Sequence, residues 1–367
     1  MYKLIQTFLL LVVYTQVLIA NQFGSDFINA KINTIKDQHT FYGMASYYNN
    51  LNYYIVDKEI HKIDSNESIE LKNTEWLAIV GRFNVLLLKQ DKLTLHVENE
   101  KLIIDNPDII NDKRTFIKTV SKPKLTTIAP ELDKIRYYQL WTPLAWLAKV
   151  IESALTAIQT HLVNSWGLAV VIFAVLLKLL LLPIGIMTTK FQRKVSQVQS
   201  ALAPKLAEIK QNYDGEEAHN RLMAAHKELG VSPFYTLRPM LGLFIQIPIL
   251  IATFNALGEM PQFTGQSFLW IKDLAYPDAI MQLPFTVSMF GDTLNLLPFL
   301  MTIITIYSTI VFQNKHAPEA EVKRQKRNLY MMAFVFFVLF YPFPAVMVLY
   351  WTLSNTLHII QQKYVEI

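Results

Sequence analysis

The sequence predicts a polytopic α-helical membrane protein that carries one small β-rich domain outside the membrane. Hydrophobic residues make up 52% of the 367 residues and charged residues only 17%, a balance typical of membrane proteins. The run Trp166–Gly185 is long enough to cross a bilayer and carries a single charge, Lys178. The sequence has no cysteine, which excludes disulfides, thiolate catalysis and cysteine-ligated metals.

Residues 1–20 predict a first transmembrane helix. Lys3 precedes an apolar stretch from about Leu4 to Ala20, a pattern shared by uncleaved signal-anchor helices and cleaved signal peptides. Leu18 is large for a residue near a cleavage site, which favours the uncleaved helix. Both alternatives keep Lys3 on the cytoplasmic side.

Residues 21–139 predict a β-rich domain, roughly Asn21–Leu125, followed by a linker. Short apolar or alternating runs are separated there by Asn, Asp, Glu and Lys clusters: NYYIVD, EWLAIVGRFNVLLL, KLTLHV and KLIID. In residues 140–165 the apolar positions recur at helical spacing and are interrupted by Lys149, Glu152 and His161. This pattern indicates an amphipathic helix that lies in the membrane interface and leads into the second span.

The rest of the chain predicts five further spans, which with the first make six: residues 166–187, 240–258, 294–312, 329–343 and 345–362. Pro342 and Pro344 end the fifth span and indicate a tight turn into the sixth. Residues 188–239 predict a charged helical hairpin, because the Asp-Gly pair in QNYDGEE indicates a turn between two helices. Residues 259–293 and 313–328 are predicted loops, and residues 363–367 a short tail.

Basic residues predict the orientation of these spans. Thr188–Pro239 contains eight Lys or Arg residues and Gln313–Asn328 five, whereas Glu259–Thr293 contains only Lys272. The positive-inside rule therefore places both basic segments in the cytoplasm. With six spans, both termini are also cytoplasmic, and residues 21–165 and 259–293 lie outside.

Lys178 is the first candidate functional residue. A lysine in a transmembrane helix costs roughly 2.5–3.5 kcal/mol on insertion scales, so it normally faces protein or water. One interpretation is that Lys178 reaches the cytoplasmic headgroups with its flexible stem. The other is that it lies in a wet cavity and attracts polar or acidic groups of a bound molecule. Gln246, Ser354 and Asn355 either share that cavity or form hydrogen bonds between helices.

The sequence contains no motif for nucleotide hydrolysis or for a common catalytic site. His219 and His226 lie on a predicted exposed helix without the carboxylate spacing of a metal site. We therefore expect no enzymatic activity, no catalytic residue, no bound metal and no cofactor.

Five stretches between Leu140 and Gln362 resemble the YidC–Oxa–Alb family of membrane protein insertases: NSWGLAVVIFAVLLKLLLLP, KFQRKVSQVQSALAPKLAEIKQNY, LGVSPFYTLRPMLGLFIQIPILIA, FLWIKDLAYPD and FPAVMVLYWTLSNTLHIIQQ. The N-terminal span and the external β-rich domain are similar to the six-span bacterial form. The resemblance implies a five-helix insertase core around a polar groove that is closed on the outer side. The groove is then open to the cytoplasm and to lipid.

The resemblance also implies roles for single residues. Lys178 matches the positively charged position of the groove, and four other residues match groove-lining or client-contacting positions: Gln246, Trp351, Ser354 and Asn355. Ala174 stands where relatives often have a polar residue, so the groove is expected to be less polar there.

The implied function is a non-enzymatic insertase and chaperone of the bacterial inner membrane. Its expected partners are nascent membrane protein clients, the lipid bilayer, the Sec translocon with its accessory subunits, and the ribosome with the signal recognition particle machinery. The alternative is a solute or ion transporter in which Lys178 binds an anionic substrate. That alternative predicts inverted repeats or paired broken helices, and the sequence shows neither.

Overall fold

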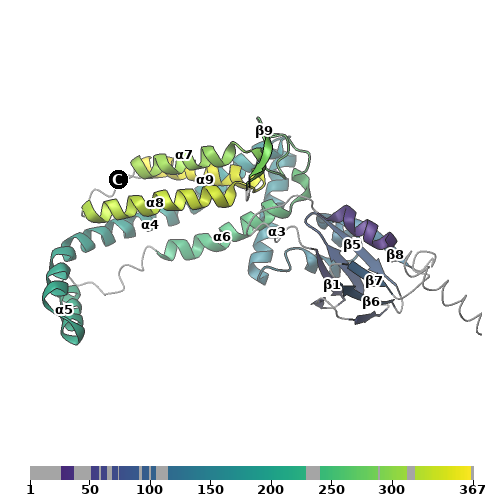
Figure 1. The fold of residues 1–367 in the computed structure, drawn as a ribbon, viewed down its shortest axis with the longest axis horizontal. Coiled ribbons are helices and arrows are strands. Elements are labelled where there is room, and N and C mark those ends of the chain that lie inside the picture. Colours follow the sequence, from purple (N-terminus) through teal and green to yellow (C-terminus); the bar gives the residue numbers. More distant parts are fainter. Residues whose placement is uncertain are drawn as a thin grey trace, which may run out of the picture. The chain divides into compact units, whose positions relative to one another are not determined.

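The computed structural model divides into two compact units (Figure 1). The β unit comprises Met1–Ala145 with Gly258–Gln262, and the helical unit comprises Trp146–Leu257 with Phe263–Ile367. The structure describes residues 26–36, 51–57, 59–63, 68–72, 74–90, 93–98, 101–104, 115–228, 240–287, 290–311 and 319–364. The predicted first span, residues 1–20, lies outside these ranges, as do residues 365–367 of the predicted tail.

The β unit contains two antiparallel sheets. The larger sheet has the order β2-β1-β4-β5-β8, formed by Ile60–Lys62, Asn52–Val56, Trp76–Val80, Asn84–Lys89 and Phe116–Ser121. The smaller sheet has the order β3-β6-β7, formed by Ser68–Leu71, Leu93–Glu98 and Lys101–Ile104. A helix over residues 26–35 precedes them. The prediction of a β-rich region before residue 125 is therefore confirmed.

The strands β4 and β5 are continuous apolar runs because both faces of the larger sheet are covered. Side chains alternate across a strand, so Leu77, Ile79, Leu86 and Leu88 enter one core. That core also contains Ile28 and Ile32 of the N-terminal helix and Leu93 and Leu95 of β6. The other face packs against two short 3₁₀ helices, η2 (Lys122–Thr127) and η3 (Pro130–Ile135).

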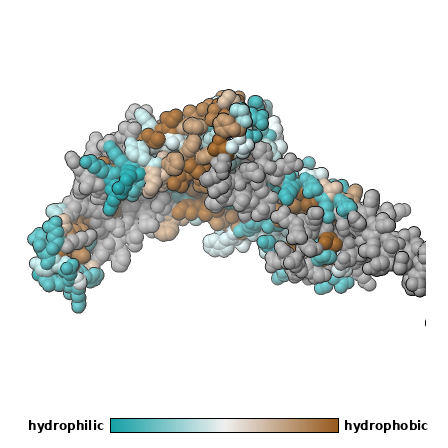
Figure 2. All heavy atoms as spheres, viewed as in Figure 1, coloured by the Kyte–Doolittle hydropathy of each residue, from teal (hydrophilic) through white to brown (hydrophobic). Residues whose placement is uncertain are grey.

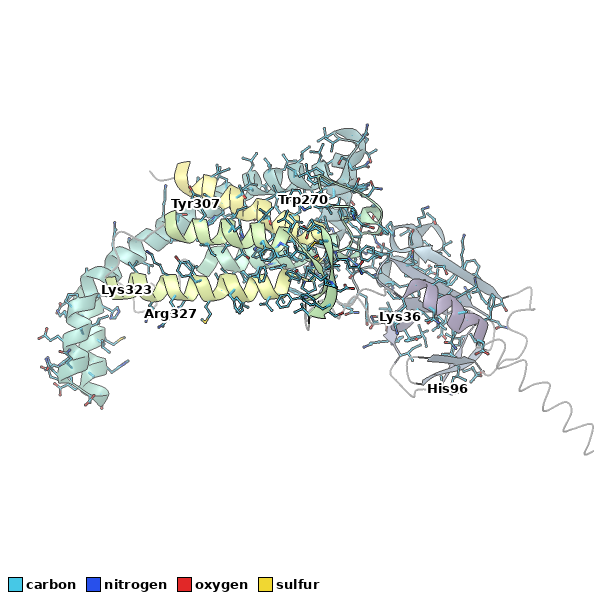
Figure 3. The ribbon with its side chains drawn as sticks, turned by 45° about the horizontal axis from the view of Figure 1, so that its top comes forward. Lys36, His96, Trp270, Tyr307, Lys323 and Arg327 are labelled. Atoms are coloured by element: carbon cyan, nitrogen blue, oxygen red, sulfur yellow. The ribbon has the colours of Figure 1, made fainter. Side chains whose placement is uncertain are left out.

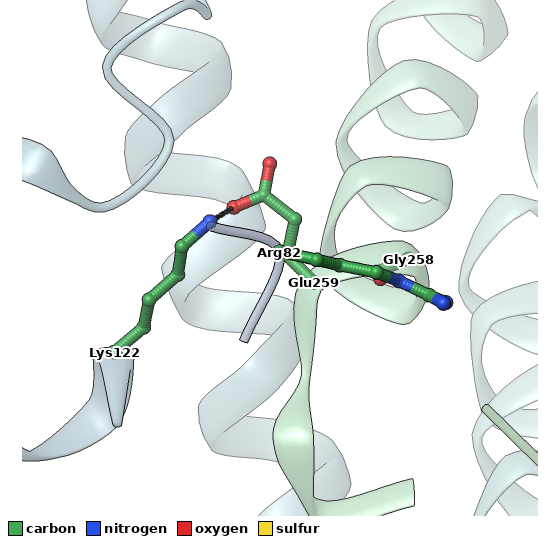
Figure 4. A network of polar contacts seen from close by, with 4 residues as sticks. All are labelled: Arg82, Lys122, Gly258 and Glu259. Atoms are coloured by element: carbon green, nitrogen blue, oxygen red, sulfur yellow. Dashed lines mark hydrogen bonds and ion pairs between the residues drawn. The ribbon is translucent and has the colours of Figure 1, made fainter. Parts of the chain in front are cut away.

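A buried ion pair holds the segment Gly258–Gln262 within the β unit. Lys122 Nζ lies 2.6 Å from Glu259 Oε2, and their side chains are only 10% and 5% exposed. Beside this pair, Arg82 Nε donates to the carbonyl of Gly258 at 2.9 Å (Figure 4). Removing two charges from water is costly, so such a pair requires close and specific contact.

The elements after residue 140 are mainly helical. They are α3 (Thr142–His161), α4 (Trp166–Asn212), α5 (Gly215–Glu228), α6 (Met240–Glu259), η5 (Pro261–Phe263), β9 (Met281–Val287), β10 (Gly291–Leu294), α7 (Leu297–Val311), α8 (Glu319–Phe340) and α9 (Ala345–Tyr364). In α3 the buried residues Ala148, Ile151, Leu155 and Ile158 recur at three- and four-residue steps, as an amphipathic helix requires.

Helix α4 joins the predicted second span to the first arm of the predicted hairpin without a break. Its 47 residues correspond to about 70 Å, more than twice the thickness of a hydrocarbon core. By length and composition, its stretch Trp166–Phe191 is the single helix of the described ranges that could cross a membrane. Phe244–Glu259 and Leu297–Ser308 are shorter apolar helices.

The helical hairpin is formed by the second half of α4 and by α5. The chain leaves α4 at Tyr213 and enters α5 at Gly215, whose φ of +62° favours glycine. Leu202, Ile209 and Ala225 form the small core between the two helices. Most of the surface of this hairpin is hydrophilic, whereas hydrophobic residues gather over the helices nearer β9 (Figure 2).

Helix α9 is central to the packing of the helical unit. It lies against α4 and α7, and α7 also packs on α8. Helix α8 begins at Glu319, ten residues before the predicted span at 329, because the charged segment EAEVKRQKRN continues the same helix. In the predicted loop 259–293 the structure contains an antiparallel β-hairpin, β9 and β10, which the sequence analysis did not expect.

Residues 263–287 and 290–296, which we call the cap, lie at one end of these helices (Figure 1). Asp278 Oδ2 accepts hydrogen bonds from the backbone of Leu296 (3.0 Å) and Leu297 (2.9 Å), and so caps the start of α7. Asn295 Nδ2 donates to the carbonyl of Tyr341 at 2.8 Å. The cap is therefore bonded to both α7 and the turn between α8 and α9.

Candidate functional site

Lys178 lies in the apolar part of α4 and faces α9. Its Nζ is 3.4 Å from Nδ1 of His358, and its side chain is partly buried. Lysine carries only donors, so the imidazole accepts from it when Nδ1 is unprotonated. No carboxylate of the described ranges pairs with Lys178, because none of the described ion pairs includes it. Lys178 therefore contacts an imidazole and no carboxylate among the described residues, so no adjacent negative charge balances its positive charge.

His358 was missed by the sequence analysis. It follows Ser354 by four residues and Asn355 by three, so the three side chains share one side of α9. This spacing was the available signal. The pairing of α9 with α4, which brings His358 to Lys178, has no signature in the local sequence.

Asn355 forms a hydrogen bond between two helices. Its Nδ2 donates to Oγ1 of Thr305 on α7 at 3.2 Å. Ser354 is partly buried, and Gln246 on α6 is exposed. Among the predicted polar site residues, Lys178 therefore contacts α9 and Asn355 contacts α7. The side chains of Ser354 and Gln246 have no hydrogen-bond partner among the described residues.

Trp351 lies in a cluster of aromatic side chains. Its ring centroid is 5.7 Å from that of Phe254 on α6 and 5.6 and 5.3 Å from those of Phe336 and Phe340 on α8. These separations are typical of favourable aromatic pairs. The tryptophan thus joins α6, α8 and α9, and its contacts indicate a packing role.

Replacing Trp351 with leucine is expected to destabilise the helical unit by about 2 kcal/mol. Each of its three aromatic pairs contributes about 0.5–1.5 kcal/mol, and the contributions are not additive. The measurement is thermal unfolding of the protein in detergent. Trp146→Leu is the matched control, because Trp146 on α3 is 65% exposed and is expected to have little effect. Equal effects of the two substitutions would contradict the packing role.

The described ranges contain no group of three or more His, Cys, Asp or Glu side chains that could hold a metal ion. The arrangement instead offers a positive charge at a depth where α4 is otherwise apolar, with amide, hydroxyl and imidazole groups on α9. Such a site can attract a carboxylate or a polar peptide segment.

These features define a class: a helical membrane protein that places polar side chains within its apolar helices. Residues 158–367 match the family model described as 60Kd inner membrane protein. Because the match covers more than half of the chain, the chain belongs to this inner membrane protein family. The match confirms the resemblance to the YidC–Oxa–Alb insertases.

Individual relatives agree with this assignment. The chain is 26% identical over 319 residues to the membrane protein insertase YidC of Chloroherpeton thalassium, covering 80% of this chain and 52% of that protein. It is 33% identical over 207 residues to the YidC of Chlorobium luteolum, covering 56% of this chain and 33% of that protein. The chain thus spans about half or less of the length of these curated relatives.

A solved structure is similar at a lower level. Its title is "Active YidC insertase crystal structure with the first transmembrane domain resolved", and it is 18% identical with a TM-score of 0.41. The match covers 85% of this chain and 74% of that one.

Proposed function

We propose that this chain inserts integral membrane proteins into the bacterial inner membrane and assists their folding, without enzymatic chemistry. The observation that carries the proposal is Lys178, a cation within an apolar helix that is paired with His358 and with no described carboxylate. Membership of the inner membrane protein family supports it, as do the names of the relatives. Gln246, Ser354 and Asn355 are the proposed polar contacts for a client beside Lys178, and Trp351 is a further proposed client contact.

Insertion of an apolar helix into lipid is favourable without nucleotide hydrolysis. Each methylene group that moves from water to an apolar phase contributes about 0.8 kcal/mol, and a span contains about 20 mostly apolar residues. That gain exceeds the cost of holding a short polar flank beside Lys178 and α9. The polar flank of a client is therefore held transiently there while its apolar helix enters lipid.

The proposed orientation places the cap outside and the helical hairpin in the cytoplasm. Lys323 and Arg327 are exposed and lie on the first half of α8, far from Trp270 of the cap (Figure 3). Basic residues are retained on the cytoplasmic side of spans. Helices α4, α6, α7, α8 and α9 are then the five spans of the core, and the first span precedes the β unit.

The proposed partners follow from this placement. Nascent clients approach from the cytoplasm, where the basic hairpin of α4 and α5 is also available to the ribosome and the signal recognition particle machinery. The Sec translocon and its accessory subunits are proposed neighbours in the membrane.

Site-specific photo-crosslinking tests the proposed client site. A photoreactive amino acid at Ser354 is expected to capture the polar flank of a client that is arrested during insertion. The control position is Phe334 on α8, which is 66% exposed and is expected to face lipid. Capture of the flank from position 334 and not from position 354 would contradict the proposed site.

A further inference from the structure

Lys178 and His358 form a pair in which a cation faces an imidazole, whereas charges removed from water are usually paired with an opposite charge. Their Nζ and Nδ1 atoms lie 3.4 Å apart. An ammonium group only donates hydrogen bonds, so Nδ1 carries the lone pair and the ring proton is on Nε2. A second proton, on Nδ1, would place two positive charges in direct contact. The pair as it stands therefore requires a neutral imidazole.

Few titratable or charged residues surround His358. Helix α9 packs on α4 and α7 and meets α6 and α8 through Trp351. On α4 the next charged residue after Lys178 is Lys190, about 18 Å further along the helix, and residues 240–257 of α6 carry no charge. The titratable residues of the other helices are Tyr307 on α7, Glu319, Glu321, Lys323, Arg324, Lys326, Arg327 and Tyr330 on α8, and Tyr350, Lys363 and Tyr364 on α9 itself. Lys178 is thus the charge that His358 contacts, and none of the described ion pairs brings a carboxylate to either residue.

A carboxylate that reaches this pair changes the balance of charge. Two unit charges 4 Å apart interact by about 4 kcal/mol at an effective dielectric constant of 20. Without an anion, repulsion of this size opposes a proton on Nδ1 of His358. With a carboxylate beside both groups, its attraction for the imidazolium offsets the repulsion from Lys178. Nζ and Nδ1 then both donate hydrogen bonds to the carboxylate.

We propose that His358 determines client specificity by taking up a proton from water when an acidic flank binds beside Lys178. This proposal rests on the function proposed above. His358 is exposed and Lys178 is only partly buried, so a client carboxylate can reach both. The bound state holds one more proton than the free state, so acidic clients bind more strongly as the pH falls. A neutral flank supplies no negative charge and gains nothing from the proton.

Competition between two clients tests this proton uptake. The full chain, in phosphatidylcholine liposomes, carries a photoreactive amino acid at Ser354 and receives equal amounts of two single-span peptides, one with an Asp-rich flank and one with an Asn-rich flank. Imidazole ordinarily titrates at about pH 6.5 and Asp at about pH 3.9, so at about pH 5.5 the acidic flank stays charged while His358 gains its proton. We expect the ratio of acidic to neutral capture to rise about three- to tenfold between about pH 7.5 and about pH 5.5.

His358→Gln and Lys178→Ala complete the test. H358Q keeps a polar side chain that binds no proton, so the rise is expected to disappear, while capture of the neutral flank shows that the site is intact. K178A is expected to lose acidic capture at the higher pH and to regain part of it at the lower pH, because His358 then supplies the remaining cation.

An unchanged ratio in the unmodified protein, an equal rise in H358Q, or no recovery in K178A would overturn the proton uptake. Failure to capture either flank would also overturn it, because neither client then reaches His358. Protease protection of the same peptides at the higher pH scores the proposed function separately. Protection without a pH-dependent ratio refutes the role of His358 alone, whereas no protection above that of empty liposomes refutes the proposed function.

Discussion

Replacing Lys178 with alanine is expected to reduce the insertion of a client with an acidic flank about tenfold, and to change the insertion of a neutral client little. A tenfold effect corresponds to about 1.4 kcal/mol. Two unit charges 4 Å apart attract by about 4 kcal/mol at an effective dielectric constant of 20, which leaves room for the cost of desolvation. Insertion is measured by protease protection in liposomes, with two clients that differ only in the charges of the flank.

Two further variants distinguish a role of the Lys178 charge from a role of its side chain in packing. Lys178→Arg keeps the charge and is expected to insert the acidic client nearly as well as the unchanged protein. His358→Ala removes the neutral partner of Lys178 and keeps the cation, so it is expected to have a smaller effect than K178A. An equal loss for both clients would show a structural role. No loss for either client would show that Lys178 only reaches the headgroups.

Replacing Lys122 with methionine is expected to destabilise the β unit by about 3–5 kcal/mol. The substitution leaves the carboxylate of Glu259 buried at 5% exposure without its cation, and an uncompensated buried charge costs about that much. The measurement is hydrogen exchange of the sheet strands in the full chain in detergent, where faster exchange reports the loss of stability.

A double variant and an exposed ion pair provide the controls. K122M with Glu259→Leu removes both charges and is expected to recover most of the stability, because the unpaired charge is then absent. Glu217 and Arg221 on α5 form an exposed pair at 2.9 Å, and Glu217→Gln is expected to cost the helical hairpin at most about 0.5 kcal/mol, measured by hydrogen exchange of the α5 amides. Similar losses for K122M and E217Q would contradict the buried character of the first pair.

The helices could be predicted from local patterns, but their partners could not. The apolar run around Lys178 and the Asp-Gly turn at 214–215 are local signals, and the structure has a helix and a helix break there. His358 contacts Lys178 across 180 residues of sequence, and Lys122 contacts Glu259 across 137. Such contacts depend on how elements pair in three dimensions.

The β9–β10 hairpin and Trp351 show two other limits of the sequence analysis. Pro284 stands in the middle of β9, and a proline argues against a strand because it donates no ladder hydrogen bond. The hairpin tolerates it because Pro284 lies between the pairs Gln282–Thr293 and Val287–Gly291, where the register shifts and no ladder partner is assigned to it. Trp351 was assigned to the groove by resemblance alone, whereas its contacts with Phe254, Phe336 and Phe340 depend on the packing of three helices.

The central proposal is that this chain inserts membrane proteins without requiring another protein, whether it works alone or beside the Sec translocon. The most direct measurement uses liposomes that contain only the purified protein and a small two-span client, scored by protease protection against empty liposomes. We expect protection above that of the empty liposomes. Protection at the empty level, with folded protein present in the liposomes, would contradict the claim.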